Sequence, residues 1–172
     1  MAKFVFILGG ARSGKSAYAL KTAKAKSKKA LYVATAQAQD SEMRSRINKH
    51  KASRPRDWQT IEEPLDLPRA LKKYKGQAEV IIIDCLTLYL SNLMHQGLKS
   101  NAIIRIIKNT AGCIRALNKT VLVISNEVGL SIVPENKLAR EFRDIAGLAN
   151  QIMAKAADEV IFIQAGIPLR LK

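Results

Sequence analysis

Short, unbroken hydrophobic runs alternate with longer polar stretches along most of the chain. A strand buried on both faces is expected to have such a run rather than an alternating pattern. The runs predict strands at residues 4–8, 30–34, 78–84, 121–125 and 159–163, and the segments 58–63 and 169–172 can form two more, which makes seven. Helical spacing of apolar residues and helix-capping signals predict helices at 14–25, 40–53, 66–75, 86–96, 101–117 and 137–157.

The first strand leads directly into a glycine-rich turn. The segment 9–16 reads GGARSGKS and matches the phosphate-binding loop pattern GxxxxGK[ST]. Glycines let backbone N–H groups turn inward around phosphate oxygens, and the helix that follows adds the positive end of its dipole. Lys15 is expected to bind the β- and γ-phosphates and the Ser16 hydroxyl to bind Mg²⁺. The sequence therefore predicts a nucleotide site.

The most strand-like segment, 78–84, ends in an acidic residue, Asp84. A carboxylate at the carboxyl end of a parallel strand can reach Mg²⁺, although such an Asp can also cap the next helix. With strands and helices alternating throughout, we predict an α/β fold of the P-loop NTPase (RecA-like) type. It has a mostly parallel sheet of about seven strands flanked by helices, in a single domain of residues 1–172.

Composition adds a strong positive charge to this picture. The 29 Lys and Arg residues exceed the 14 Asp and Glu residues, for a formal net charge of +15. This favours a polyanionic partner, nucleic acid or a phosphorylated small molecule, or it reflects a lysine-rich solvated surface. Aromatic residues make up only 5%, which is a poor basis for stacking single strands. No apolar run approaches a membrane span, and Cys85 and Cys113 are read as core residues of a cytoplasmic protein.

A basic segment surrounds one of the two histidines. Met43, Ile47 and His50 share one face of the predicted helix 40–53. His50 could be a catalytic nucleophile or a half-buried structural residue, whereas His95 is expected only to face the end of its helix dipole. These features leave three alternatives open: a small-molecule phospho- or nucleotidyltransferase, a RecA-like nucleic-acid ATPase, and a nucleotide sensor. The sequence lacks the NKxD guanine signature, so the base stays undecided.

Several longer segments resemble one known family. They are GGARSGKS at 9–16, YVATAQ at 32–37, the DxEMxxRIxxHKxxRPxxW pattern at 40–58, EEPLDL at 62–67, DCLTLYLSNL at 84–93 and the segment from NEVG to ANQ at 126–151. In this order they resemble the bifunctional adenosylcobinamide kinase/adenosylcobinamide-phosphate guanylyltransferases of cobalamin biosynthesis. The resemblance implies phosphorylation of adenosylcobinamide by ATP or GTP. Transfer of GMP from GTP through a histidine then gives adenosylcobinamide-GDP and pyrophosphate.

The resemblance also implies which residues carry this chemistry. His50 matches the family's guanylylated histidine, and Lys49 stands where many members have a second one. Ser16 and Asp84 would bind Mg²⁺. No nucleic acid or membrane insertion is expected, and the family suggests a homo-oligomer, a trimer. The implied nucleotide contacts are Gly9, Gly10, Ala11, Arg12, Ser13, Gly14, Lys15, Ser16, Val33, Ala34, Thr35, Lys51, Ala52, Ser53, Arg54, Glu62, Glu63 and Asp84.

Overall fold

The predicted strands form one seven-stranded sheet in the order β3-β2-β4-β5-β1-β6-β7. The computed structural model describes residues 2–38, 41–52, 54–55 and 57–172, without the side chains of residues 42, 43, 46, 49, 50 and 52. The strands are β1 (Phe4–Gly9), β2 (Ala30–Ala34), β3 (Gln59–Glu62), β4 (Val80–Asp84), β5 (Thr120–Asn126), β6 (Glu159–Gln164) and β7 (Ile167–Arg170). The helices are α1 (Lys15–Lys26), α2 (Ser41–Ala52), α3 (Leu67–Tyr74), α4 (Leu86–His95), α5 (Ser100–Arg115) and α6 (Lys137–Ala156).

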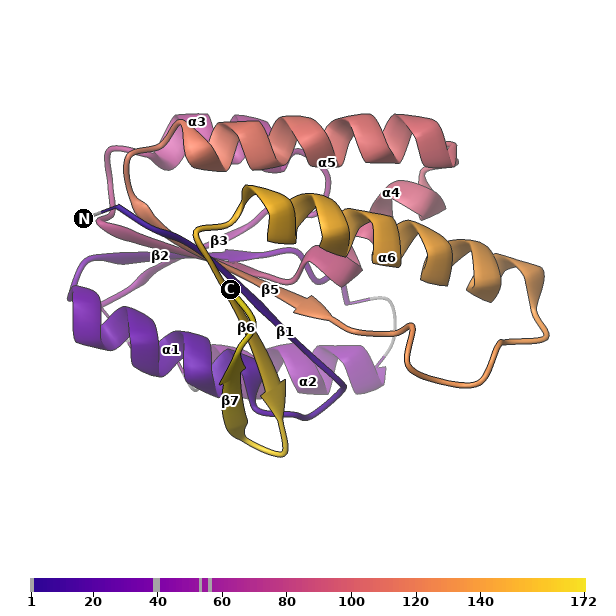
Figure 1. The fold of residues 1–172 in the computed structure, drawn as a ribbon. Coiled ribbons are helices and arrows are strands. Elements are labelled where there is room, and N and C mark those ends of the chain that lie inside the picture. The colour runs from indigo at the N-terminus through magenta and orange to yellow at the C-terminus, as the bar shows by residue number, and fades with distance from the viewer. Residues whose placement is uncertain (1, 39–40, 53, 56) are drawn as a thin grey trace.

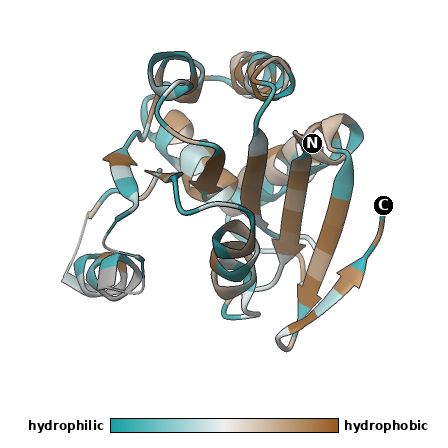
Figure 2. Ribbon diagram, turned by 90° about the vertical axis from the view of Figure 1, so that its left-hand side faces the viewer, coloured by the Kyte–Doolittle hydropathy of each residue, from teal (hydrophilic) through white to brown (hydrophobic). Residues whose placement is uncertain are grey.

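Helices cover both faces of the sheet (Figure 1). α1 and α2 lie on one face, and α3 to α6 lie on the other. The central strand β1 shows why its run is unbroken: Phe4, Phe6 and Leu8 join the core under α3 to α6, while Val5 and Ile7 join the core under α1. Figure 2 shows the central strands as largely hydrophobic ribbons between the two helical layers. Because both faces of the sheet are covered, both sets of side chains are buried.

The last strand differs from the prediction. β7 pairs antiparallel with β6 and covers Ile167–Arg170 instead of 169–172. Ala165 and Gly166 form a two-residue hairpin turn with φ angles of 50° and 83°, the positive pair expected of a turn that follows strand twist. The strand predicted at 169–172 begins after Pro168, but β7 includes Pro168, because an edge strand tolerates a residue without an N–H group. The P-loop-type parallel sheet is otherwise as predicted.

Two further expectations concern membranes and cysteines. Among the described residues, no helix combines the length and apolar character that crossing a bilayer requires. Both cysteines are free thiols: Cys85 is buried in the core and Cys113 is half-buried. Burial raises the pKa of the Cys85 thiol to about 12, so it stays protonated and acts as a small apolar residue.

Candidate active site

The glycine-rich turn between β1 and α1 adopts a conformation that its sequence requires. Gly9 has a φ of 152°, and a Cβ there would lie 2.3 Å from the carbonyl oxygen of Ile163 in β6. Gly14 caps α1 in the left-handed region, with a φ of 101°. The turn is also held by β6–β7, since the N–H of Gly166 donates to the carbonyl oxygen of Ser13 at 2.9 Å. Larger residues at 9 or 14 would displace this turn.

Lys15 is buried at the start of α1, with only 7% of its surface exposed. Its Nζ donates to the Gly10 carbonyl oxygen at 2.6 Å and contacts Ser13 Oγ at 3.5 Å. Burial lowers the pKa of Lys15, while the nearby carboxylate of Asp84 acts in the opposite direction. A buried ammonium held by one carbonyl and one hydroxyl is well suited to exchange those partners for phosphate oxygens.

Asp84 collects two hydroxyl groups at the carboxyl end of β4. Ser16 Oγ donates to Asp84 Oδ2 at 2.9 Å, and Tyr32 Oη donates to the same oxygen at 2.5 Å. Tyr32 comes from β2, which neighbours β4 in the sheet. Burial and the adjacent carboxylate raise the pKa of the Tyr32 phenol, which therefore remains a donor. The two predicted magnesium ligands, Ser16 and Asp84, are thus in direct contact.

The basic segment after α2 reaches the same group of residues. The guanidinium of Arg54 stacks on the ring of Tyr32, 3.8 Å from its centroid. Its Nε and Nη1 are buried and have no hydrogen-bond partner within the described part of the protein. Lys51 forms an ion pair with Glu62 at 2.5 Å, which ties the end of α2 to β3. A stacked guanidinium with unused donors is suited to bind an anion.

The ends of β2 and β4 are fixed by a buried side-chain network. Thr35 Oγ1 donates to the Cys85 carbonyl oxygen at 2.7 Å and accepts from the Cys85 N–H at 2.8 Å. Asn92 Nδ2 donates to the Thr35 carbonyl oxygen at 2.8 Å. Thr35 is fully buried. These bonds hold the strand ends where Tyr32 and Asp84 meet, so the site is preorganised.

These residues surround a cavity of about 560 Å³ at the carboxyl edge of the parallel strands. This volume is within the range of about 300–1,000 Å³ that is usual for small-molecule sites. Its lining brings together ten of the predicted nucleotide contacts. They are Ala11, Arg12, Ser13, Gly14, Lys15, Ser16, Ala34, Arg54, Glu62 and Asp84. The remaining lining residues are Ala17, Tyr32, Ala36, Ile47, Cys85, Leu88, Ile124 and Asn126.

Other predicted contacts have different positions. Val33 is buried in the core, Thr35 holds Cys85, and the Glu63 carboxylate accepts the N–H groups of Leu65 and Asp66 in the turn before α3. The predicted residues outside the lining are Gly9, Gly10, Val33, Thr35, Lys51 and Glu63. Ser53 and the side chains of His50 and Ala52 lie outside the described residues. The backbone of His50 belongs to α2, three residues after Ile47, which lines the cavity.

Two polar residues that line the cavity, Tyr32 and Asn126, are not among the site residues predicted from the sequence. Asn126 ends β5 as Asp84 ends β4, so the strand-end rule that identified Asp84 also indicates Asn126. Tyr32 carries no such signal. It lies within a buried strand, and its contact with Asp84 spans 52 residues of sequence.

Residues 5–171 match the protein family described as cobinamide kinase / cobinamide phosphate guanyltransferase. The chain belongs to this family. A "Bifunctional adenosylcobalamin biosynthesis protein CobP" of Pseudomonas aeruginosa is 40% identical over 170 residues, covering 96% of this chain and 95% of the relative. A "Bifunctional adenosylcobalamin biosynthesis protein CobU" of Escherichia coli is 38% identical over 181 residues, with coverages of 98% and 99%. The corresponding protein of Salmonella typhimurium is 40% identical over 181 residues, also with coverages of 98% and 99%.

These matches confirm the predicted family and the predicted enzyme class. As a cobinamide kinase / cobinamide phosphate guanyltransferase, the chain uses nucleotide substrates and acts on a corrinoid. The fold is confirmed independently by a solved structure titled "Crystal structure of the RadB recombinase". It superposes with a TM-score of 0.52 at 16% identity, over 93% of this chain and 73% of that one. At this identity the likeness supports the RecA-like fold alone.

Proposed function

We propose that this one cavity carries out both reactions of the cobinamide kinase / cobinamide phosphate guanyltransferase family. The observation that carries the proposal is the lining itself. The P-loop residues, Asp84 and Arg54, which follows the His50 helix, border one space. A nucleoside triphosphate held there by Lys15 presents its phosphates both to a bound corrinoid and to α2.

In the first reaction, the hydroxyl oxygen of adenosylcobinamide bonds to the terminal phosphorus of ATP or GTP. The bond to the β–γ bridging oxygen breaks, the nucleoside diphosphate leaves, and the hydroxyl proton passes to solvent. Lys15 and the backbone N–H groups at the amino end of α1 stabilise the charge on the phosphate oxygens. Arg54 adds a buried positive charge that protein groups leave largely unsatisfied.

In the second reaction, a ring nitrogen of His50 bonds to the α-phosphorus of GTP, and pyrophosphate leaves. A phosphate oxygen of adenosylcobinamide phosphate then displaces the histidine and gives adenosylcobinamide-GDP. Two features support His50 in this role. Its Cα lies on the same face of α2 as Ile47, which lines the cavity, because residues three apart are neighbours on a helix. The guanidinium of Arg54, four residues after His50, adds positive charge to this region, and nearby positive charge favours the neutral, nucleophilic imidazole.

Mg²⁺ fits the oxygen donors at this site. Ser16 Oγ and a carboxylate oxygen of Asp84 lie side by side, and Mg²⁺ in nucleotide sites takes one or two such protein ligands plus phosphate oxygens. No cluster of three or more His, Cys, Asp or Glu occurs in the described ranges. Bound there, the ion would neutralise phosphate charge, while Tyr32 orients the Asp84 carboxylate.

We also propose that nucleic acid is not a partner despite the +15 charge, and that the enzyme works in the cytoplasm as a homo-oligomer, a trimer. The free thiols of Cys85 and Cys113 suit a reducing compartment. Added RNA or DNA should leave nucleotide turnover unchanged. A nucleic-acid-dependent hydrolysis without corrinoid consumption would instead support an ATPase of the RecA-like type. Sedimentation equilibrium would test the oligomeric state.

The decisive experiment uses GTP labelled at the α- or the γ-phosphate, with Mg²⁺ and no corrinoid. We expect label from the α-position, and none from the γ-position, to remain on the denatured protein. The adduct should be labile in acid and stable in alkali, as a phosphorus–nitrogen bond is. His50→Ala should abolish it while phosphorylation of adenosylcobinamide continues, and His95→Ala is the matched control. Normal guanylyl transfer by His50→Ala would show that another residue, or direct transfer, is used.

A further inference from the structure

Asn126 ends β5 between the two strands that carry the phosphate-binding groups. It lies opposite Gly9 of β1, and Ile124, two residues earlier, lies opposite Asp84 of β4. Ile124 and Asn126 both line the cavity. Since side chains alternate along a strand, Asn126 shares a face with Leu122 and Ile124, which pack in the α1 core. Asn126 is therefore on the face where the P-loop leads into α1.

The backbone of Asn126 is already occupied by the protein. Its N–H donates to Thr87 Oγ1 at 2.7 Å, and its carbonyl oxygen accepts from Asn150 Nδ2 at 3.3 Å. Because β4 ends at Asp84, no strand residue is available on that side, and the side chain of Thr87 from α4 takes its place. The polar group that Asn126 can offer to a ligand in the cavity is thus its side-chain amide.

The groups that hold Asn126 are themselves buried and mutually bonded. Ser125 Oγ donates to Asn150 Oδ1 at 2.7 Å and lies 3.3 Å from Thr87 Oγ1. The exposed fractions of Ser125, Thr87 and Asn150 are 1%, 5% and 6%. The next residue, Glu127, donates its N–H to the Gly9 carbonyl oxygen at 3.0 Å. Burying three polar side chains is unfavourable unless they are bonded in this way, and the result fixes Asn126 relative to the P-loop.

We propose that Asn126 is a catalytic residue of the kinase step, a role that rests on the function proposed above. Its Nδ2 donates a hydrogen bond to an oxygen of the terminal phosphoryl group as that group moves from the β–γ bridging oxygen to the corrinoid hydroxyl. A neutral amide suits this place beside Asp84, because it stabilises phosphate charge without adding another carboxylate. Thr87 and Asn150 act through Asn126 and are positioning residues.

The role makes the two reactions separable. Charge develops on the terminal phosphoryl group when it is transferred to the corrinoid, but in His50 guanylylation the bond that breaks is at the α-phosphorus. Asn126→Ala should lower kcat of the kinase by about 100-fold, the usual effect of losing one transition-state donor. The rate of α-label capture by His50 should change by less than about threefold, because the terminal phosphoryl group is not transferred in that reaction. Asn101→Ala, an exposed Asn in α5, is the matched control.

Two further variants keep the test decisive. Asn126→Asp has nearly the same shape but presents a carboxylate, so it should be at least as slow as Asn126→Ala, and it decides the question if the alanine variant does not fold. Thr87→Val should lower kinase kcat by about tenfold, as loss of an orienting partner does, and Thr87→Ser should restore it because the hydroxyl remains.

The proposal is overturned if folded Asn126→Ala keeps kinase kcat within about threefold of the wild type, since loss of a transition-state donor has a larger effect. The proposal is also overturned if kinase kcat and the rate of α-label capture by His50 fall by similar factors. In that case Asn126 would contribute to nucleotide binding in both reactions. Failure of the function proposed above looks different. In that case the unmodified protein forms no α-labelled adduct or does not consume adenosylcobinamide.

Discussion

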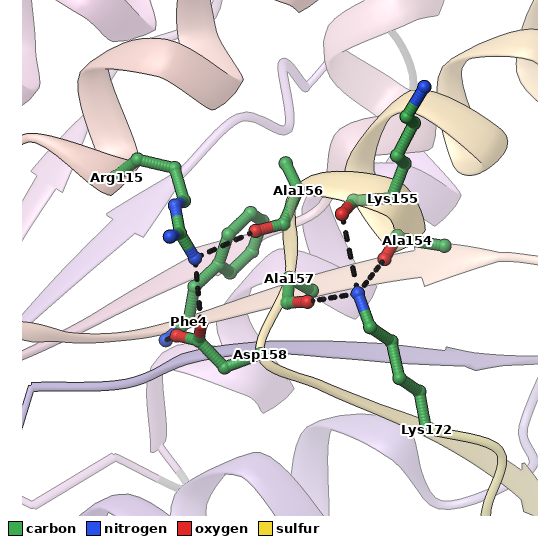
Figure 3. Close-up of polar contacts among 8 residues, drawn as sticks. All are labelled: Phe4, Arg115, Ala154, Lys155, Ala156, Ala157, Asp158 and Lys172. Atoms are coloured by element: carbon green, nitrogen blue, oxygen red, sulfur yellow. Dashed lines mark hydrogen bonds and ion pairs between the residues drawn. The ribbon is translucent and has the colours of Figure 1, made fainter.

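One aspartate lies at the carboxyl ends of the parallel strands (the carboxyl edge) and another at their amino ends (the amino edge). The partners of the two carboxylates differ. Asp84, at the carboxyl edge, contacts only hydroxyl groups among the bonds described above, those of Ser16 and Tyr32. Asp158, at the amino edge, accepts the Phe4 N–H at 2.7 Å and Arg115 Nη1 at 2.7 Å (Figure 3). One carboxylate has neutral partners that a ligand can replace. The other is neutralised by the protein.

The same contrast holds for the lysines at the two edges. Lys15 is held by a carbonyl and a hydroxyl beside the cavity. Lys172 Nζ donates to three carbonyl oxygens at the end of α6, those of Ala154, Lys155 and Ala157. A larger hollow of about 920 Å³ lies at this amino edge. Its volume does not make it the active site, because Arg115 and Lys172 are engaged with protein groups. Whether the polar groups of a cavity are already bonded to the protein therefore indicates a ligand site better than the cavity volume does.

The largest effect on activity is expected when the Lys15 ammonium at the carboxyl edge is removed. Lys15→Ala should lower both kinase and guanylyltransferase turnover by at least about 100-fold, because one ammonium holds the triphosphate in each reaction. Steady-state rates with ATP and with GTP would measure this. Lys21→Ala, an exposed lysine of the same helix, is the control. Retention of either activity near its normal level would reveal a second nucleotide site.

A smaller effect on activity is expected when one of the two hydroxyl partners of Asp84, that of Tyr32, is removed. Tyr32→Phe keeps the ring beneath Arg54 but removes the hydroxyl that donates to Asp84 Oδ2. Loss of such an orienting hydrogen bond typically reduces activity by about 10-fold or more, so kcat should fall by about that factor. Tyr32→Leu should be slower still, since the Arg54 contact is lost too. Equal rates for Tyr32→Phe and wild type would show that Ser16 alone orients the carboxylate. Tyr18→Phe, in α1, is the matched control.

How far the sequence predicts these edges depends on the distance between contacting residues. The P-loop is encoded within eight consecutive residues, so its position and lysine were predictable. The strand-end rule located Asp84 and could have located Asn126. By contrast, the Tyr32–Asp84 bond and the Arg54–Tyr32 stack depend on which strands become neighbours. The β6–β7 hairpin was missed because Pro168 and Gly166 are signals of a turn, and local sequence does not show that an edge strand can hold Pro168.

At the amino edge we expect an effect on stability and none on catalysis. Hydrogen bonding to the Phe4 N–H and pairing with Arg115 lower the pKa of Asp158. A lowered folded-state pKa stabilises the protein above the unfolded-state value of about 4, and this contribution is lost as pH falls through the folded-state pKa. The side chain is 41% exposed, so solvent screening limits the contribution to about 1 kcal/mol.

Asp158→Asn should therefore lower the free energy of unfolding at pH 7 by up to about 1 kcal/mol and leave kcat unchanged. Urea unfolding at pH 7 and at pH 3 would test the sign, because the difference between variant and wild type should shrink at the lower pH. Asp144→Asn, an exposed residue of α6, is the control. If the difference in the free energy of unfolding between variant and wild type grew in acid, the assigned direction of the Asp158 pKa shift would be wrong.

The smallest expected effect concerns Lys172. Its backbone is placed by pairing with β6, where the Leu171 N–H donates to the Val160 carbonyl oxygen at 2.8 Å. Its ammonium then meets the carbonyl oxygens at the end of α6, the negative end of the helix dipole. Lys172→Met keeps the apolar stem and removes the charge, so unfolding should become easier by about 0.5 kcal/mol. Lys155→Met is the matched control, since Figure 3 shows that its side chain points away from this cluster. The difference should decrease in high salt, because an exposed charge–dipole interaction is screened. A salt-independent loss would mean that Lys172 acts by packing its stem, and a loss of kcat would mean that the two edges are coupled.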